Sequence, residues 1–479
     1  MAPSMEIDDN VDKKSKSTTT AAKKKVGTPS ASSEEASPHP DMSLAQDIHR
    51  VMMVHNSTLS VEDATAIIGM DPAALLDKVI SRVGTGGKSV EEAIKENQAK
   101  YNTTEDDKSG ETKKDDDDEE EGSDKADEII EPLLNAALCR HLQSSLGSNQ
   151  SDALSEENLT AIETHHESII KILRENITKA KDEAGDMEVL HAHMEVARYC
   201  AKCTTKEVAL SAYEEVVALP KLSIGKKLDA YLEMTRVSSF WGDWKTMNET
   251  LAKAAKVIEK GGDWDRRNRL KAYQAMSYLC SRDLKSASTL LVEGIATFSC
   301  VELCEYSEFI MYAIVTNLLY LKRTEMKKSI IDGSEILQVS KDIPVVMQLA
   351  NTLYDCDYKA YLHTLVDLQP HLVANRYLQP HSGYILRELH VLAFQQFLDS
   401  YQSVTLESMA TSFGVGVEFL DLQLSRFIAA GRLTAKIDKY GGVVETNRPD
   451  WKNARYQDMI QKGDLLLNRI QKLGRVVDL

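Results

Sequence analysis

The sequence contains few of the residues that interrupt helices. Its 479 residues include only 23 glycines and 11 prolines, and aromatic residues make up 6% of the chain. Because glycine and proline are the strongest helix breakers, their scarcity favours a mainly α-helical protein. The sequence has no apolar run that approaches the length of a membrane span, so an integral membrane protein is excluded. The length leaves room for about three domains.

Cysteine is also scarce, and its distribution argues against a disulfide framework. The seven cysteines are odd in number and scattered over a long chain. The N-terminal residues lack the apolar core of a secretory signal. We therefore expect reduced thiols and a protein of the cytoplasm and nucleus, with no membrane partner.

Negative charge is concentrated in one run rather than spread over the chain. The formal net charge is −17, and residues 105–131 hold 15 acidic and 4 basic side chains. A run of this kind repels itself and cannot bury a core, so we expect a disordered acidic linker over residues 101–127. The linker is either a solvated spacer or a segment that binds a partner. Residues 1–42, rich in lysine, serine and threonine, are expected to form a disordered tail.

The middle of the chain has the pattern of consecutive helices. Residues 43–100 contain short helices with visible caps, such as Ser60 and the pair Asp71-Pro72. From residue 128 to about residue 401 the helical pattern is nearly continuous. A weak repeat of turn-then-helix segments occurs in this part, and its segments begin at Thr205, Asp243, Asp283 and Asp357. Paired helices at this period predict a tetratricopeptide-like helical-repeat solenoid over residues 128–290, and a non-repetitive helical bundle is the alternative.

Residues 404–446 predict a compact unit of two helices followed by a β-hairpin. Thr405 can cap a first helix over Leu406–Phe413, and glycines at 414 and 416 permit the sharp turn that follows. The second helix has one apolar stripe at helical spacing, formed by Val417, Leu420, Leu424, Phe427 and Ile428. Alternation over 433–438 and a turn at 439–442 predict the hairpin. This order of elements is the outline of a winged helix.

The charge of this winged unit argues against nucleic-acid binding. Its second helix carries Glu418, Asp421 and Arg426, whereas a helix that reads the major groove should be basic. The unit either packs on its own chain or docks to another protein, since a small hairpin exposes strand edges that a neighbour can extend. The second alternative gives four candidate interaction residues: Val443, Val444, Glu445 and Thr446.

The segment 455–477 predicts one long amphipathic helix. Its apolar positions follow a heptad-like spacing and give seven further candidate interaction residues: Tyr456, Met459, Ile460, Leu466, Leu467, Ile470 and Leu473. A helix at this place has nothing local to cover its apolar side. We expect it to pack against partner helices, in this chain or in others.

Three motifs suggest catalysis or ligand binding but lack the residues that these require. Residues 84–89 resemble a phosphate-binding loop, but Arg82 stands where its first glycine is needed, and Ser89 reads more simply as a helix cap. His191, His193, Cys200 and Cys203 fall in one predicted helix, where they cannot converge on a metal. The same His-x-His pair lacks the serine and aspartate of a metal-dependent deubiquitinase, because Ala201 and Thr204 occupy those positions. We therefore expect no catalytic residue, no metal and no cofactor.

Three stretches give the chain a specific resemblance. These are residues 261–271 (GGDWDRRNRLK), residues 413–438 together with 443–450, and residues 462–473 (KGDLLLNRIQKL). With the predicted order of solenoid, winged helix and terminal helix, they resemble the PCI-domain subunits of the 26S proteasome regulatory-particle lid. The resemblance covers roughly residues 125–479, and the acidic run departs from it. It implies a PCI domain over 291–450, with the winged helix at 383–450, and a C-terminal bundle helix over 451–479.

The resemblance also implies a role. Subunits of this kind are non-catalytic scaffolds of a hetero-oligomer, in which winged-helix domains join side by side and C-terminal helices gather in a bundle. The implied partners are other lid subunits and, as a further candidate, the ATPases of the base. The deubiquitinase activity of the lid belongs to a different subunit. PCI subunits of the COP9 signalosome share this architecture and are the main alternative; a translation-initiation PCI scaffold is a third.

Overall fold

The computed structural model describes residues 37–86, 88–102, 133–146, 156–183, 185–446 and 451–477. The predicted N-terminal tail and acidic linker lie largely outside these residues. The expected end of the tail at residue 42 is wrong, because Ser37 and Met42 are both buried and Asp41 caps the first helix with its side chain. The described part of the chain therefore starts before the predicted boundary.

The first five helices are α1 (Met42–His55), α2 (Val61–Ile68), α3 (Pro72–Val83), α4 (Val90–Asn102) and α5 (Ala136–Leu146). All except α2 contribute to a small core, which Leu159 and Ile162 of the next helix also join. Ser60 and Asp71 cap α2 and α3 through their side chains, as expected. Leu44 and Ile48 of α1, Val79 of α3 and Leu138 of α5 belong to this core.

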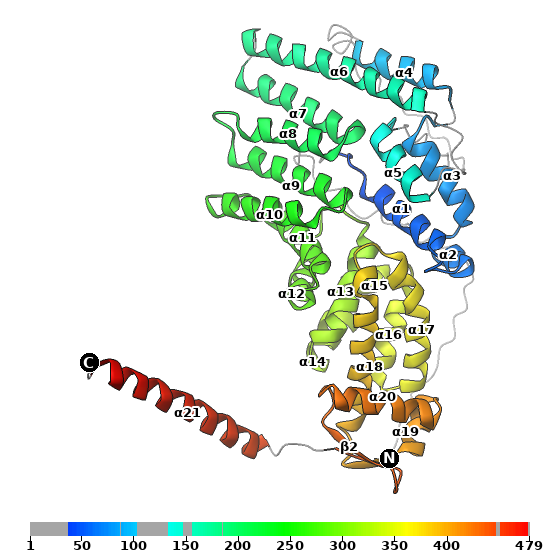
Figure 1. Ribbon diagram of the computed structural model, residues 1–479, viewed down its shortest axis with the longest axis vertical. Helices are drawn as coiled ribbons and strands as arrows, with labels where there is room; N and C mark the ends of the chain where they lie inside the picture. The colour runs from blue at the N-terminus through cyan, green and yellow to red at the C-terminus, as the bar shows by residue number, and fades with distance from the viewer. Residues whose placement is uncertain are drawn as a thin grey trace, which may run out of the picture. The chain divides into compact units, whose positions relative to one another are not determined.

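The chain then continues as a stack of helices in which each packs against the next. They are α6 (Glu156–Glu183), α7 (Asp186–Cys203), α8 (Lys206–Val217), α9 (Ile224–Phe240), α10 (Trp244–Glu259), α11 (Trp264–Cys280) and α12 (Leu284–Gly294). Figure 1 shows α6 to α10 lying side by side in chain order. The fold is therefore mainly α, as predicted, whereas the tetratricopeptide-like type of the repeat stays a prediction.

The four predicted repeat segments all begin at helix N-caps. Asp243, Asp283 and Asp357 have nearly the same backbone angles, with φ of −88°, −87° and −84°. Each accepts a hydrogen bond from a backbone N–H three residues later, and each follows a residue in the left-handed region. Thr205 caps α8 without such a hydrogen bond. The repeat in the sequence is thus a repeated tight turn between two helices.

The second half of the body is built from α13 (Tyr306–Tyr320), α14 (Arg323–Met326), α15 (Ser334–Val339), α16 (Pro344–Asp355), α17 (Tyr358–Ala374) and α18 (Ser382–Leu398). One continuous hydrophobic core extends from Leu228 of α9 to Val444 near the end of the body. It passes through Leu291 and Ile295. The boundary predicted between residues 290 and 291 therefore has no break in the core.

The winged unit comprises β1 (Ser403–Thr405), α19 (Leu406–Phe413), α20 (Val417–Ala429), β2 (Ala435–Asp438) and β3 (Val443–Thr446). Both helices and the hairpin agree with the prediction. The strand β1 was not predicted; it pairs antiparallel with β3 and gives the strand order β1-β3-β2. The apolar stripe of α20 is buried at Leu420, Leu424 and Phe427, but Val417, which was assigned to it, is exposed in the first turn.

A single long helix, α21 (Trp451–Val477), follows the winged unit. Its extent agrees with the amphipathic helix expected over 455–477. Within the described ranges, none of the helices combines the length and apolarity that a bilayer span requires.

Candidate protein-docking surfaces

The winged unit is fixed to the preceding helices by a cluster of aromatic rings. Phe413, the last residue of α19, lies with its ring centroid 4.9 Å from Tyr358, 5.0 Å from Phe394 and 5.4 Å from Phe397. Tyr358 belongs to α17 and the two phenylalanines to α18. Aromatic contacts of this kind add to the energy of burial. The unit is therefore held on α17 and α18 rather than hung on a flexible linker.

The predicted interaction strand β3 is the inner strand of the sheet. Its residues pair with β1 on one side and β2 on the other, and Val444 is 0% exposed. The backbone N–H of Thr446 donates to Gln402 O at 2.9 Å. The expectation that β3 offers a free edge is therefore wrong, because the unpredicted strand β1 occupies it. The outer edges of this sheet belong to β1 and β2.

Three of the four predicted strand residues still face outward, at least in part. Val443 and Thr446 are half-buried, and Glu445 is exposed. Their contact with a neighbouring protein stays a prediction. Val444 packs in the core and has no surface to offer a partner.

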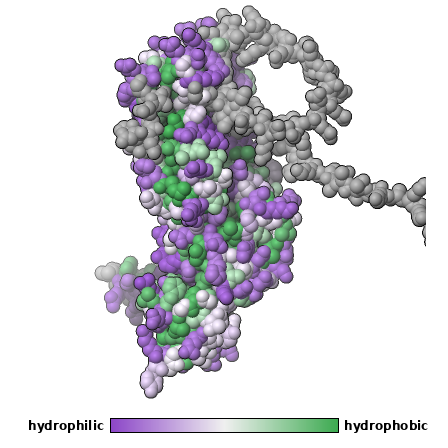
Figure 2. Space-filling model, turned by 90° about the vertical axis from the view of Figure 1, so that its right-hand side faces the viewer, coloured by the Kyte–Doolittle hydropathy of each residue, from purple (hydrophilic) through white to green (hydrophobic). Residues whose placement is uncertain are grey.

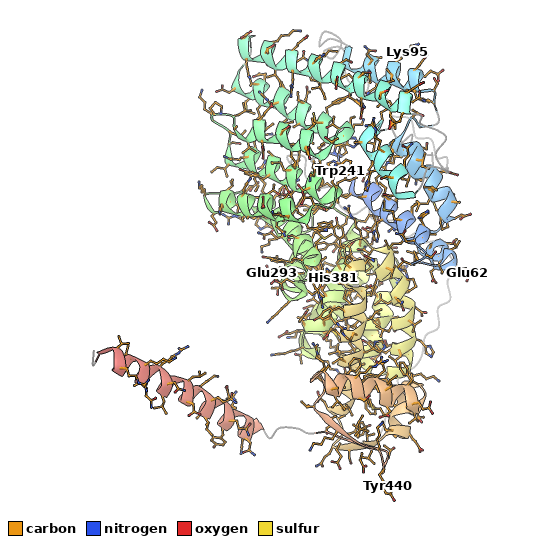
Figure 3. All side chains as sticks on the ribbon, viewed as in Figure 1. Glu62, Lys95, Trp241, Glu293, His381 and Tyr440 are labelled. Atoms are coloured by element: carbon orange, nitrogen blue, oxygen red, sulfur yellow. The ribbon has the colours of Figure 1, made fainter. Side chains whose placement is uncertain are left out.

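The outward side of the winged unit carries apolar residues that the sequence analysis did not single out. Phe419 and Leu422 of α20 are exposed, and they share one face because they are three residues apart. Tyr440 is fully exposed at the tip of the β2–β3 hairpin, where Figure 3 shows it pointing away from the unit. Phe419 and Leu422 could have been found in the sequence, since both fall outside the buried stripe of α20.

Charge on the winged unit is balanced locally. Lys439 of the hairpin lies 3.1 Å from Asp421 of α20, and Arg432 pairs with Glu388 of α18. These pairs neutralise two of the few basic groups of the unit. The surface that remains is mixed in charge and partly apolar, which suits a protein partner better than a row of phosphates.

The long helix α21 exposes its apolar side. All seven residues predicted for the bundle contact are between 55% and 66% exposed. Leu465 and Val476, which were not predicted, are exposed as well. The surroundings of Gly463 in the same helix are also open, because a Cβ atom added there would meet no atom within 4 Å. Figure 2 shows, by contrast, that polar and apolar residues are interspersed over the face of the body it presents. Among the described residues, α21 is the helix whose apolar side is least covered.

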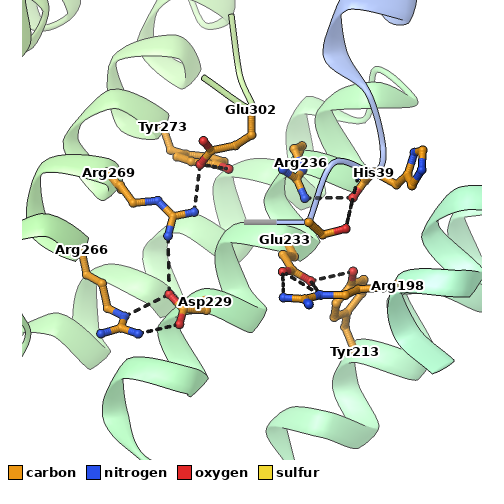
Figure 4. A network of polar contacts seen from close by, with 11 residues as sticks. His39, Arg198, Tyr213, Asp229, Glu233, Arg236, Arg266, Arg269, Tyr273 and Glu302 are labelled. Atoms are coloured by element: carbon orange, nitrogen blue, oxygen red, sulfur yellow. Dashed lines mark hydrogen bonds and ion pairs between the residues drawn. The ribbon is translucent and has the colours of Figure 1, made fainter. Parts of the chain in front are cut away.

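Two of the three arginines in the sequence stretch 261–271 have a structural role. Arg266 of α11 makes two hydrogen bonds to the carboxylate of Asp229 of α9, at 3.0 and 2.9 Å. Arg269 lies 2.9 Å from Glu302, which also accepts a hydrogen bond from Tyr273 (Figure 4). The bonds to Asp229 raise the pKa of the Arg266 guanidinium. This network ties α9, α11 and the turn before α13 together.

Of the four residues that suggested a metal site, three are packing residues of α7. His193, Cys200 and Cys203 are buried, whereas His191 is exposed on the same helix. Burial raises the pKa of Cys200 to about 11 and that of Cys203 to about 12, so both thiols are protonated at neutral pH. No cluster of three metal-binding side chains occurs in the ranges that the structure describes.

The loop that resembled a phosphate site belongs to the turn between α3 and α4. The hydroxyl of Ser89 accepts a hydrogen bond from the N–H of Glu92 at 3.3 Å, as expected for a helix cap. The residues before it form the helix α3, where a phosphate loop requires a buried strand. Residue 87 lies outside the described residues.

Comparison with known proteins covers both the stack of helices and these surfaces. Three family models match: the 26S proteasome subunit RPN7 over residues 155–329, the PCI domain over 358–448, and the RPN7/PSMD6 C-terminal helix over 455–477. The last of these ranges contains the exposed apolar residues of α21. The PCI range contains the winged unit.

Whole-chain comparison gives a consistent result. The 26S proteasome non-ATPase regulatory subunit 6 homolog of Arabidopsis thaliana is 41% identical over 326 residues, which cover 68% of this chain and 84% of that protein. The 26S proteasome non-ATPase regulatory subunit 6 of Oryza sativa subsp. japonica is 42% identical, over 65% of this chain and 80% of that protein. The COP9 signalosome complex subunit 1 of Arabidopsis thaliana is 26% identical over 32% of this chain and 35% of that protein. The chain therefore belongs to the family of the 26S proteasome non-ATPase regulatory subunit 6, also called RPN7.

Proposed function

We propose that this chain is a structural subunit of the lid of the 26S proteasome regulatory particle, and that it supports lid assembly and ubiquitin-dependent protein degradation. The observation that carries the proposal is α21, which matches the family's C-terminal helix and leaves its apolar side uncovered. Burial of a leucine or isoleucine side chain contributes roughly 1.5–3 kcal/mol. A row of such side chains is a strong reason for α21 to bind partner helices.

The winged unit supplies a second docking surface in this proposal. It is held rigidly on α17 and α18, so a partner that binds it is also oriented relative to the body. Its outer strand edges, the exposed face of α20 and the hairpin tip are available to neighbouring PCI subunits of a hetero-oligomer. The ATPases of the base are a further proposed partner. Nucleic acid and membranes are not.

We infer that the subunit is not itself an enzyme. The His-x-His pair lacks the serine and aspartate that a metal-dependent deubiquitinase needs, and its histidines occupy opposite sides of α7. The cysteines in the same helix are held as thiols by burial, which does not suit a nucleophile. The strongest polar network, around Arg266 and Arg269, serves to join helices.

The alternative is a subunit of the COP9 signalosome, and the extent of the matches supports the proteasome. The likeness to the signalosome subunit covers about a third of this chain. The likeness to the proteasome subunits covers about two thirds of it and reaches 84% of the relative's length. The proposed location is the cytoplasm and nucleus, where a fluorescently tagged chain should be seen in both compartments.

The decisive experiment removes the apolar character of α21 without shortening the chain. Leu467→Glu combined with Ile470→Glu should leave the body folded and prevent incorporation into the lid. The matched control is Val366→Glu, which changes an apolar residue of α17 that is 67% exposed and lies outside both docking surfaces. Affinity purification of each tagged chain, with mass spectrometry of the bound proteins, gives the result.

The outcomes separate the alternatives. The proposal is supported if lid subunits are recovered with the unchanged chain and with the control but not with the double variant. Signalosome subunits in their place would select the alternative. Normal recovery of the lid with the double variant would contradict the role given to α21.

A further inference from the structure

The N-terminal segment Ser37–His55 crosses between two parts of the chain that are far apart in the sequence. We call it the strap; it consists of an extended piece, Ser37–Asp41, and the helix α1. Its middle is tied to the end of α17 by the side chain of Gln46, which is 6% exposed. The Gln46 amide donates to Ala374 O at 3.3 Å and accepts from the N–H of Arg376 at 3.1 Å. One side chain thus forms two hydrogen bonds with backbone from the C-terminal half of the chain.

Neighbouring residues of α1 extend the contact with the C-terminal half of the body. The ring of His49 forms a hydrogen bond of 3.3 Å with Val373 O. Arg50 lies 3.4 Å from Glu308 at the start of α13. The carboxyl group of Glu308 that Arg50 faces is half-buried, and this burial raises its pKa above the usual value. Polar contacts therefore run along one side of α1.

The other end of the strap is held by α9. Arg236, only 1% exposed, donates through Nη2 to His39 O at 2.8 Å, as Figure 4 shows. The hydroxyl of Ser37 donates to the same carbonyl oxygen at 3.2 Å. Asp41, at the start of α1, pairs with Arg82 of α3. The extended piece is therefore held to α9 at His39 and to α3 at Asp41.

One residue connects the two ends of the strap's binding site. Arg376, whose N–H donates to Gln46, also donates through Nη2 to Ser239 O and Phe240 O at 2.7 and 2.9 Å. These carbonyl groups are the last of α9, where a helix has free acceptors and partial negative charge. The guanidinium also lies 5.4 Å from the ring centroid of Trp244 at the start of α10. Arg376 thus joins the strap, the end of α9 and the end of α17.

Apolar side chains of α1 enter two different cores. Met42 belongs to the large core of α9 to β3, whereas Leu44, Ile48 and Val51 belong to the core of the N-terminal helices. Only Ser43 and His55 of α1 are exposed. The helix is a shared element of both cores, which makes its binding cooperative along the strap.

We propose that the strap binds as one cooperative unit at the place where the ends of α9 and α17 meet, which we call the joint. Its binding keeps these two helix ends fixed relative to each other. When the strap is bound, Gln46 holds the backbone of Arg376. The guanidinium of Arg376 then stays in place on the C-terminal carbonyl groups of α9. When the strap leaves, both ends of the joint lose buried hydrogen bonds at the same time. The strap thereby determines how rigidly α9 and the helices before it are attached to the PCI region. This inference does not depend on the identity of the complex in which the chain works.

The test is hydrogen exchange with mass spectrometry on the full chain carrying Gln46→Ala. Loss of the two Gln46 hydrogen bonds should speed exchange about tenfold at 372–378, next to the change. Because the strap leaves as a unit, exchange should speed up by the same factor at 37–41 and 236–241, where Gln46 makes no contact. His49→Ala, a milder change of the same face, should give the same pattern at smaller amplitude and serves if Gln46→Ala does not fold.

The matched control is Gln396→Ala in α18. Its amide also donates to a distant backbone carbonyl, Leu353 O, at 3.1 Å, but it lies outside the strap. The control should speed exchange near 353–357 and leave 37–41 unchanged. Faster exchange confined to 372–378 in Gln46→Ala, or no change at 236–241, would overturn the proposal.

Discussion

The guanidinium of Arg198 lies across the carboxylate of Glu233, with Nη2 at 2.9 Å from Oε1. Glu233 is 5% exposed and belongs to α9, whereas Arg198 reaches it from α7. The second carboxylate oxygen accepts a hydrogen bond from the hydroxyl of Tyr213 of α8 at 2.9 Å. Three consecutive helices of the stack thus meet at one buried negative charge.

Replacement of Arg198 should loosen this part of the stack. Arg198→Ala leaves the buried carboxylate with Tyr213 as its remaining partner, at a cost of about 1–3 kcal/mol in the free energy of unfolding. The control is Lys221→Ala, because Lys221 pairs with Asp186 at 3.0 Å and the two side chains are 77% and 75% exposed. Exposed pairs contribute roughly 0–1 kcal/mol, so the control should change little. Thermal unfolding followed by circular dichroism compares the two; equal midpoints would contradict the role of Glu233.

The sequence was sufficient for the elements whose signals are local. The caps at Ser60 and Asp71 and the turn at Gly414 depend on residues within one helical turn, and the structure has them where the pattern placed them. The repeat beginning at Asp243, Asp283 and Asp357 was visible for the same reason. Each marks a turn whose geometry its own residues determine.

Features that depend on long-range pairing were missed. The strand β1 is very short, and it is a strand only because β3 lies beside it. Two helices and another strand separate β1 from β3 along the chain. The free edge expected along β3 is occupied for that reason, whereas the contact of Val443–Thr446 with a neighbouring protein stays a prediction. The role of Gln46 was equally hidden, since its partners Ala374 and Arg376 come from the opposite half of the sequence. The exposed residues of α21, in contrast, were predicted from heptad spacing alone.

Removal of a repeated cap should weaken the turn it stabilises. Asp283→Ala deletes the acceptor for the N–H of Ser286, 3.3 Å away, and should cost about 1 kcal/mol, the usual value of an N-cap. Asp283→Asn keeps an oxygen acceptor and should restore most of the loss. Hydrogen exchange at the first turn of α12 is the measurement. The prediction fails if the asparagine variant is as unstable as the alanine variant.

Substitution of Val444 should disrupt folding of the winged unit rather than docking alone. Val444 is fully buried in the central strand, so Val444→Asp places a charge in the core and should cost more than about 3 kcal/mol. Glu445→Lys, on the exposed side of the same strand, should leave the unit folded. Limited proteolysis of the two variants, with mass mapping of cuts between 400 and 446, distinguishes them. Rapid cleavage of Val444→Asp and protection of Glu445→Lys is the expected result.

The buried imidazole of His166 should make the N-terminal part of the body sensitive to acid. Its Nε2 lies 2.9 Å from Leu134 O, which can only accept, so Nε2 carries the proton and Nδ1 accepts from the Tyr199 hydroxyl at 2.7 Å. Burial lowers the pKa of His166 to about 4, and the nearby His165 and Lys202 lower it further. The hydrogen bond to Leu134 and the negative charge of Glu163 raise it, but by less.

The sign follows from where the proton binds. Between about pH 6.5 and pH 4 the unfolded chain takes up a proton at His166 that the folded chain does not, so stability falls as the pH decreases through this window. The loss approaches about 3 kcal/mol at the acid end. His166→Gln can keep both hydrogen bonds without titrating, and should therefore reduce the dependence of the thermal midpoint on pH. His55→Gln, at an exposed position of α1, should leave that dependence unchanged. A steep acid dependence that persists in His166→Gln would assign the sensitivity to another group, of which His39, with its pKa lowered to about 4 mainly by burial, is the first to test.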